Sequence, residues 1–374
     1  MKNILIACDS FKGSASSKEV TSAIAKGISN TNKEFKIEQC PLADGGEGSL
    51  LAIENHIDSQ RVLVSTVDAL NRPIKAFYLI DNRDNTAYIE MANSVGIELL
   101  SPDELDALKS SSYGVGIMMK DAFKKKVAKI VLFVGGSATN DMGVGAAQAL
   151  GVSFITLSGK DKILRGNDVG RIKDYIIPDY LHTKSIVVAT DVTNPLYGPA
   201  GASMVYGPQK GGDHNQIQFL DQSFRSLASL VQQKTGTDLQ NLPGSGAAGG
   251  IAGGMVAFGN GKIVPGAKYI LDLLKVEYKI SEADLLITGE GKMDHQTLHG
   301  KLISKLSEIA QKFGVPICAV CGNIELNHAE KEELGIIDDY SIKKWTNNAA
   351  YTNKSTIFHL EEIGEEIGRK YLRK

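Results

Sequence analysis

Apolar and polar positions follow one recurring order along much of the chain. A short apolar run ends in a polar loop that contains glycine, and a stretch with helical spacing comes next. In residues 4–28, the apolar run Ile4–Cys8 leads into such a loop, and Val20, Ile24 and Ile28 then recur at helical spacing. The same order starts again near residues 130, 186 and 285. Repeated units of strand, loop and helix predict a parallel sheet covered by helices.

Residues 61–91 have a different pattern. Several segments with strand character follow one another without helical spacing, and turn residues separate them at 71–73 and 81–85. This pattern predicts antiparallel strands. We therefore predict an α/β protein of two domains. One is a discontinuous parallel-sheet domain built from both chain ends, residues 1–65 and 284–374, and the other is an inserted mixed α/β domain, residues 66–283.

Length and charge narrow the classes of protein that fit. The chain has 374 residues, more than a single core usually supports, which agrees with two domains. Its 41 basic and 43 acidic residues nearly balance, which argues against a nucleic-acid partner because phosphate binding requires a basic face. No apolar run approaches the length of a membrane span, and the first one is too short for a signal peptide. We expect a cytoplasmic protein without a membrane partner.

Two residue pairs have the spacing of a redox or a metal motif but lack other features of that motif. Cys318 and Cys321 form a C-x-x-C pair, but the surrounding apolar run predicts a buried strand, where positions three apart face opposite sides. Four cysteines in a chain of this length are not a disulfide framework. His295 and His299 have the spacing of a helical zinc pair, but Gln296 occupies the position of the glutamate in H-E-x-x-H. Structural or solvated roles are the favoured interpretation for both pairs.

Polar side chains follow five of the predicted strands. In open α/β sheets ligands bind beyond the carboxyl ends of the strands, so loops of this kind predict a site. The loop at 135–141 also precedes a helix and offers backbone N–H groups to an anion. Lysines in or beside glycine-containing loops suit phosphate, and acids beside them suit a divalent ion. The loops contain Asp9, Ser10 and Lys12; Asp44 and Glu47; Ser137, Thr139, Asn140 and Asp141; Asp191 and Asn194; and Gly289, Glu290, Gly291, Lys292 and Asp294.

Common nucleotide and hydrolase motifs do not explain these loops. The chain has no P-loop motif and no G-x-S-x-G elbow. Residues 244–249 match G-x-G-x-x-G, but no apolar strand precedes them and no acid follows at the distance that a dinucleotide site requires. We interpret this segment as a turn and helix of small residues that lets backbone pack closely, either against other backbone or against a nucleotide.

Seven runs together resemble one family, the bacterial glycerate kinases related to the enzymes of glucarate and glyoxylate utilisation. The runs occur in family order over nearly the whole chain, and only the tail after residue 324 matches loosely. The resemblance implies ATP-dependent phosphorylation of glycerate with Mg²⁺, on a two-domain α/β fold whose chain ends form a Rossmann-like domain. The runs are DSFKGS (9–14), PLADGGEGS (41–49), GGSATNDMGVGAAQALG (135–151), DVTNPLYGPAGAS (191–203), YGPQKGG (206–212), GSGAAGGIAGG (244–254) and TGEGKMDHQTLHGK (288–301).

On this basis we assign expected roles. Asp44, Glu47, Asp191 and Glu290 would hold Mg²⁺ directly or through water. Asp191, or else Asp294, would accept the proton of the substrate hydroxyl. Lys12, Lys210 and Lys292 would face phosphate oxygens or the glycerate carboxylate. Further contacts with phosphate or substrate are expected from Asp9, Ser10, Ser137, Thr139, Asn140, Asp141, Asn194, Gln209, Gly289, Gly291, Gln296 and Lys301.

Two alternatives remain open, and the position of phosphorylation is a separate expectation. The substrate could be another small hydroxy acid, because specificity depends on the shape of the pocket. The protein could instead bind sugar acids without catalysis, although a sensor has no need of acids that hold a metal. The family resemblance favours 2-phosphoglycerate as the product. We expect the active site in the cleft between the two domains.

Overall fold

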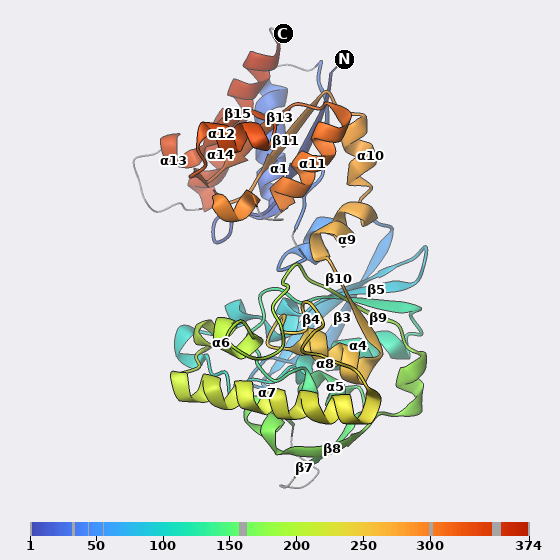
Figure 1. Ribbon diagram of the computed structural model, residues 1–374. Coiled ribbons are helices and arrows are strands. Elements are labelled where there is room, and N and C mark those ends of the chain that lie inside the picture. Colours follow the sequence, from blue (N-terminus) through green and yellow to red (C-terminus); the bar gives the residue numbers. More distant parts are fainter. Residues whose placement is uncertain are drawn as a thin grey trace. The chain divides into compact units, whose positions relative to one another are not determined.

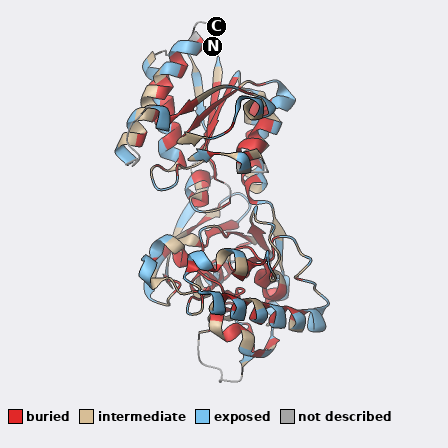
Figure 2. Ribbon diagram, turned by 60° about the vertical axis from the view of Figure 1, so that its left-hand side comes forward, coloured by how far each residue is buried: buried red, intermediate tan, exposed pale blue. Residues whose placement is uncertain are grey.

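A computed structural model describes residues 2–31, 34–43, 45–54, 56–156, 163–298, 302–345 and 353–372. The chain forms two compact units. Unit 1 consists of Met1–Asp44, Leu51–Ile57 and Ala267–Lys374, and unit 2 consists of Gly45–Leu50 and Asp58–Gly266. Each unit has a sheet and a hydrophobic core of its own (Figures 1 and 2). The predicted fold class, a parallel-sheet domain from both chain ends with an inserted mixed α/β domain, is confirmed. The domain limits at 65/66 and 283/284 stay a prediction.

Unit 1 is built on a sheet of five parallel strands. The strand order is β15-β13-β11-β1-β2, so strands from both chain ends pair directly, with Ile6 opposite Ile287. The central strands are apolar and buried, as expected for a sheet covered on both faces. The strands are β1 (Asn3–Cys8), β2 (Lys36–Gln39), β11 (Leu285–Gly289), β13 (Ile317–Cys321) and β15 (Ile336–Ser341), with a short parallel pair β12 (Lys292–Met293) and β14 (Asn323–Ile324).

Helices α1 and α14 pack together over one face of this sheet. Residues of both helices share a core with β1, β11 and β13, and α10 and α11 lie on the opposite side from α14 (Figure 1). A Cβ atom at Gly27 of α1 would lie 2.0 Å from the backbone oxygen of Glu361 in α14, so glycine is needed at this crossing. The helices are α1 (Ser17–Thr31), α10 (Val276–Ser281), α11 (Leu302–Phe313), α12 (His328–Glu333), α13 (Ile342–Trp345) and α14 (Asn353–Leu372), and both α2 (Ser49–Glu54) and α9 (Gly266–Leu273) include residues of both units.

Unit 2 contains a mixed sheet of six strands in the order β10-β9-β6-β5-β4-β3. Strands β10, β9, β6 and β5 run parallel, and β4 pairs antiparallel with both β5 and β3. The antiparallel arrangement predicted for residues 61–91 is therefore confirmed. The strands are β3 (Ser59–Val67), β4 (Pro73–Asp81), β5 (Thr86–Glu90), β6 (Lys129–Phe133), β9 (Ile186–Ala189) and β10 (Gly261–Val264), with a separate antiparallel pair β7 (Ser153–Thr156) and β8 (Ile172–Ile176).

The helices of unit 2 pack around this sheet in one large core. The longest is α7 (His214–Thr235), which begins at a capping box formed by Asp213 and Gln216 and ends at Gly236, whose φ is 76°. The others are α3 (Ala92–Val95), α4 (Tyr113–Lys124), α5 (Val144–Ala149), α6 (Ala202–Tyr206) and α8 (Ile251–Gly259). In the described part of the chain, no helix is long and apolar enough to cross a membrane.

The pair Cys318 and Cys321 lies in β13, a fully buried strand, as predicted. Burial raises the pKa of the Cys321 thiol to about 12. At neutral pH this thiol is protonated, so the C-x-x-C pair contributes to packing in the core.

Candidate active site

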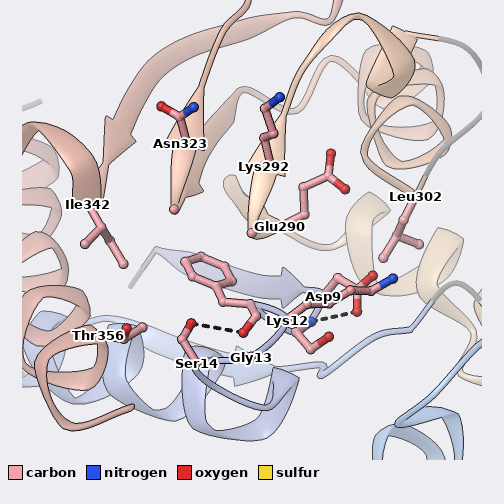
Figure 3. Close-up of a pocket in the computed structure, with 14 residues that line it drawn as sticks. Asp9, Lys12, Gly13, Ser14, Glu290, Lys292, Leu302, Asn323, Ile342 and Thr356 are labelled. Carbon is pink, nitrogen blue, oxygen red and sulfur yellow. Dashed lines mark hydrogen bonds between the residues drawn. The ribbon is translucent and has the colours of Figure 1, made fainter. Parts of the chain in front are cut away.

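A cavity of about 460 Å³ opens in unit 1 at the carboxyl ends of the parallel strands. The chain leaves β1 toward β2 on one side, while β11 lies on the other, so the strand order reverses between β1 and β11. Ligands of doubly wound α/β sheets bind at such a reversal. The cavity is lined by Asp9, Ser10, Phe11, Lys12, Gly13, Ser14, Glu290, Gly291, Lys292, Leu302, Gly322, Asn323, Ile342 and Thr356 (Figure 3).

Six residues predicted from the sequence line this cavity together. Asp9, Ser10 and Lys12 follow β1, and Glu290, Gly291 and Lys292 follow β11. Gly289 ends β11 in close contact with the next strand, because a Cβ atom there would lie 1.6 Å from the backbone oxygen of Val320.

The charged side chains beside β11 are already engaged within unit 1. The Lys292 Nζ lies 2.9 Å from Glu325 Oε2 and 3.5 Å from Asp294 Oδ2. The hydrogen bond with Glu325, followed by the charge of the same acid, raises the pKa of Lys292. Glu290 accepts a hydrogen bond of 2.7 Å from the Thr297 hydroxyl. These contacts fix the loop that presents Glu290 and Lys292 to the cavity.

Sequence reasoning missed the apolar part of this cavity. Phe11 lies inside one of the matching runs, but its side chain has no chemistry that would mark it as a site residue. Leu302, Ile342 and Thr356 come from helices α11, α13 and α14, far apart in the sequence. No local pattern signals that these helix ends meet, because only the sheet order brings them to one edge.

A second group of predicted residues meets in unit 2, after β6. The Lys210 Nζ donates hydrogen bonds to Ser137 Oγ at 2.9 Å and to the backbone oxygen of Thr139 at 2.7 Å. Lys210 is only 2% exposed. Burial lowers the pKa of Lys210 to about 7, and the nearby charge of Asp141 opposes this shift. The amine therefore titrates near neutral pH.

Asp141 and Asn140 occupy the same buried loop. The Asp141 carboxylate accepts four hydrogen bonds, from the backbone N–H and hydroxyl of Ser112 and from the N–H groups of Gly143 and Gly145, at 2.8 to 3.2 Å. Burial raises the pKa of Asp141. These bonds hold the start of α5 against the segment before α4. The Asn140 side-chain amide is fully buried and has no hydrogen-bond partner among the described residues.

The glycines at 45–48 lie against the loop after β6. A Cβ atom at Gly135 would lie 2.3 Å from Gly46 Cα, and one at Gly136 would lie 3.7 Å from Glu47 Oε2. The buried Glu90 carboxylate at the end of β5 accepts hydrogen bonds from Gly48 N at 2.9 Å and from Leu50 N at 3.0 Å. The exposed Glu47 is therefore held beside the glycines of the β6 loop.

The loop after β9 carries Asp191 and Asn194. Asp191 is exposed, whereas the Asn194 side chain donates to the backbone oxygen of Ala200 and accepts from the Tyr206 hydroxyl, each at 2.8 Å. The small-residue segment 244–250 joins this loop to the β6 loop. Gly246 N donates to Asn194 O at 3.1 Å, and a Cβ atom at Gly249 would lie 2.0 Å from Thr139 O. Close backbone packing, as the sequence indicated, explains the glycines here.

The remaining predicted residues have less structural context. Gln209 is exposed in a short 3₁₀ turn directly before Lys210. His295 Nδ1 lies 2.9 Å from Glu330 Oε1. Asp44, His299 and Lys301 lie outside the described residues, as does the side chain of Gln296. The predicted residues thus gather in two groups, one at the cavity of unit 1 and one around the β6 and β9 loops of unit 2.

A family model described as the glycerate kinase family matches residues 4–372. The chain belongs to this family. It is therefore an enzyme that transfers a phosphoryl group, as the sequence predicted, and family membership implies ATP as the donor.

Named relatives span most of the chain. A glycerate kinase from Halalkalibacterium halodurans is 35% identical over 346 residues, which cover 91% of both chains. A glycerate 2-kinase from Escherichia coli K12 is 33% identical over 342 residues, covering 91% of this chain and 88% of the relative. A crystal structure from Salmonella typhimurium LT2, of a protein assigned as glycerate kinase 2, superposes with a TM-score of 0.85 at 32% identity and covers 100% of this chain and 98% of that one.

Proposed function

We propose that this member of the glycerate kinase family phosphorylates D-glycerate with Mg-ATP and forms 2-phosphoglycerate. The observation that carries the proposal is the unit 1 cavity, where lysines and acids follow two adjacent parallel strands of a kinase-family chain. The 2-position is favoured by the resemblance of the sequence and by the relative named glycerate 2-kinase. We also propose that residues of both units take part in this one reaction.

The residues present are compatible with Mg²⁺. No group of three or more His, Cys, Asp or Glu side chains is placed to hold a metal in the described part of the chain. Mg²⁺ does not need such a group, because it usually takes one or two carboxylates and completes its shell with water and phosphate oxygens. Glu290, with Glu47, Asp191 and Asp44, would hold the ion directly or through water. When bound, Mg²⁺ would neutralise charge on the phosphates of ATP.

The side chains of the enzyme would position the reactants and move one proton. Lys12 and Lys292 would hold phosphate oxygens, and Lys210 would hold an oxygen of phosphate or of the glycerate carboxylate. The substrate hydroxyl oxygen forms a bond to the γ-phosphorus of ATP, and the bond from that phosphorus to the β–γ bridging oxygen breaks and releases ADP. Asp191, or else Asp294, would accept the hydroxyl proton.

The test is ADP release from the purified protein with Mg-ATP and D-glycerate. Controls lacking the metal or the acid should release little ADP. Adding enolase alone distinguishes the products, because it consumes 2-phosphoglycerate directly and 3-phosphoglycerate only after a mutase is added. ADP release with another hydroxy acid but not with D-glycerate would keep the kinase and change the substrate. If none of the acids tested leads to ADP release, the result would contradict the kinase and favour the non-catalytic binder.

A further inference from the structure

The unit 1 cavity combines two different surfaces. Phe11, Leu302 and Ile342 line it with apolar side chains that are at most 3% exposed. Asp9, Lys12 and Glu290 line it with charge. Figure 3 shows Ile342 and Thr356, from α13 and α14, on one side and Asp9, Lys12 and Glu290 on the other. A ligand that fills this space must therefore have an apolar part and a charged part.

The volume of the cavity indicates which of the two substrates of the proposed reaction it fits. A volume of about 460 Å³ is within the range of sites that enclose drug-sized ligands. Glycerate is much smaller and has no apolar part that would match Ile342 and Phe11. A nucleotide has both parts, a base with two apolar faces and a charged phosphate chain.

Thr356 supplies an independent indication of a ligand. Its side chain lines the cavity and is only 1% exposed, and its Oγ1 has no hydrogen-bond partner among the described residues. An unsatisfied buried hydroxyl is costly, so a bound group is expected to complete it. The edge of a nucleotide base carries the donors and acceptors that can do so.

The opposite side of the cavity suits the phosphate chain. The loop 9–14 leads from β1 into α1, and it carries Lys12 and Gly13. Gly13 has a φ of 74°, and apart from its two chain neighbours no described residue has an atom within 4 Å of the place where its Cβ would be. The backbone of this loop is therefore open to close approach by a ligand, beside a lysine and at the point where the strand order reverses.

From these observations we infer that the cavity of unit 1 binds the nucleotide. Its base lies at the α13–α14 side, where Ile342 contacts its face and the Thr356 hydroxyl bonds to its edge. Its phosphates extend toward Lys12 and Glu290. The inference rests on the proposed use of ATP. It assigns a base-recognition role to two residues of the C-terminal tail, the part of the chain that matches the family sequence runs least.

Calorimetric titration of the full-length protein with ADP, adenosine and D-glycerate, each alone, tests the inference without turnover. Thr356→Val keeps the shape of the side chain and removes the hydroxyl. This variant should lower the affinity for ADP and for adenosine about fivefold, whereas Thr356→Ser should retain most of the affinity. Ile342→Ala should lower the affinity for ADP and for adenosine about tenfold. Ile337→Ala is the matched control, because Ile337 is 53% exposed on β15 and lies outside the cavity lining. Affinity for D-glycerate should stay within about twofold in every variant.

The outcomes separate the inference from the proposed function. Wild-type protein that binds no ADP would contradict the use of ATP itself. Tight ADP binding that neither Thr356→Val nor Ile342→Ala changes would overturn the inference and leave the kinase intact. Loss of D-glycerate binding with unchanged ADP binding would also overturn it, because the cavity would then be the acceptor site. Circular dichroism and thermal unfolding of each variant establish that it is folded.

Discussion

Buried ionisable side chains organise the loops of unit 2, and burial moves their pKa values toward neutrality. Glu90 is 3% exposed, and burial raises its pKa to about 7 even though backbone N–H groups of Leu50 and Gly48 stabilise the charged form. Burial also lowers the pKa of Lys210 to about 7, because the charged form of a lysine is the protonated one. Burial disfavours the charged form of either group, so it raises the pKa of an acid and lowers the pKa of a base.

Glu90 should make the stability of the protein depend on pH. Its pKa is higher in the folded state than in the unfolded state, where it is near the ordinary value of 4.5. Its contribution to stability is therefore fully present below the unfolded pKa and is lost as pH rises toward about 7. Urea unfolding at several pH values between these limits should show this loss for the wild type. The Glu90→Gln variant should lack this component, and identical pH profiles for the two proteins would contradict the prediction.

Asp191 is the first choice for the catalytic base. Because it is exposed on the loop after β9, Asp191→Asn should leave the midpoint of thermal unfolding nearly unchanged. Turnover with D-glycerate should fall by about 100-fold or more, the usual contribution of a positioned general base. Asp294→Asn, measured in parallel, decides between the two candidates. A folded Asp191→Asn protein with near-normal turnover would remove Asp191 from the mechanism.

At the scale of elements, contact between helices depends on small residues at crossings. Gly27 of α1 faces the backbone of α14, and Gly364 of α14 faces the backbone of α1, where a Cβ atom would lie 2.4 Å from Ile24 O. Both glycines are inside helices, where they lower helix propensity. The close approach of the two backbones explains why glycine is present in spite of that cost.

Gly27→Ala should destabilise unit 1. Alanine favours the helix by roughly 0.5–1 kcal/mol, but the clash with Glu361 O requires α1 and α14 to separate, and overpacking of this kind typically costs about 1–3 kcal/mol. The clash should therefore dominate and lower the thermal midpoint. Ser29→Ala, at an exposed position of the same helix, is the control and should have little effect. Equal or higher stability of Gly27→Ala would mean that the crossing adapts at no cost.

At the scale of the whole molecule, each unit has its own sheet and its own core, and the chain ends meet in one of them. Pairing of β1 with β11 joins residues far apart in sequence, so unit 1 can form only after the inserted unit has been synthesised. The cavity that we assign to the nucleotide is lined entirely by residues of unit 1.

Hydrogen exchange should locate the two ligands in different parts of the chain. ADP should slow amide exchange in the loop 9–14, in 289–293 and at the start of α14, because these segments surround the cavity. D-glycerate alone should leave these segments unchanged. Mass spectrometry of peptides from the full-length protein measures both effects. Protection by ADP confined to unit 2 would contradict the assignment of the nucleotide.

Much of this architecture could be predicted from the sequence because its signals are local. The buried strands β1, β6, β9, β11 and β13 are short apolar runs, and the antiparallel strands β3 to β5 lack helical spacing between them. The glycine-containing loops marked where polar side chains would follow strands. Seven motifs in family order, between residues 9 and 301, then predicted the enzyme class, and the family model that matches residues 4–372 confirms it.

The tertiary structure decided which side chains within those loops face a cavity and which hold the loops in place. Asp9 and Asp141 both follow a strand in a polar, glycine-containing loop, and nothing local distinguishes them. Yet Asp9 lines a cavity, whereas the Asp141 carboxylate accepts four hydrogen bonds from its own chain. The sequence by itself determined the elements, the enzyme family and the loops that carry polar chemistry. Strand order and helix packing alone brought Phe11, Ile342 and Thr356 to the lining of one cavity, because the segments that carry them share no local pattern.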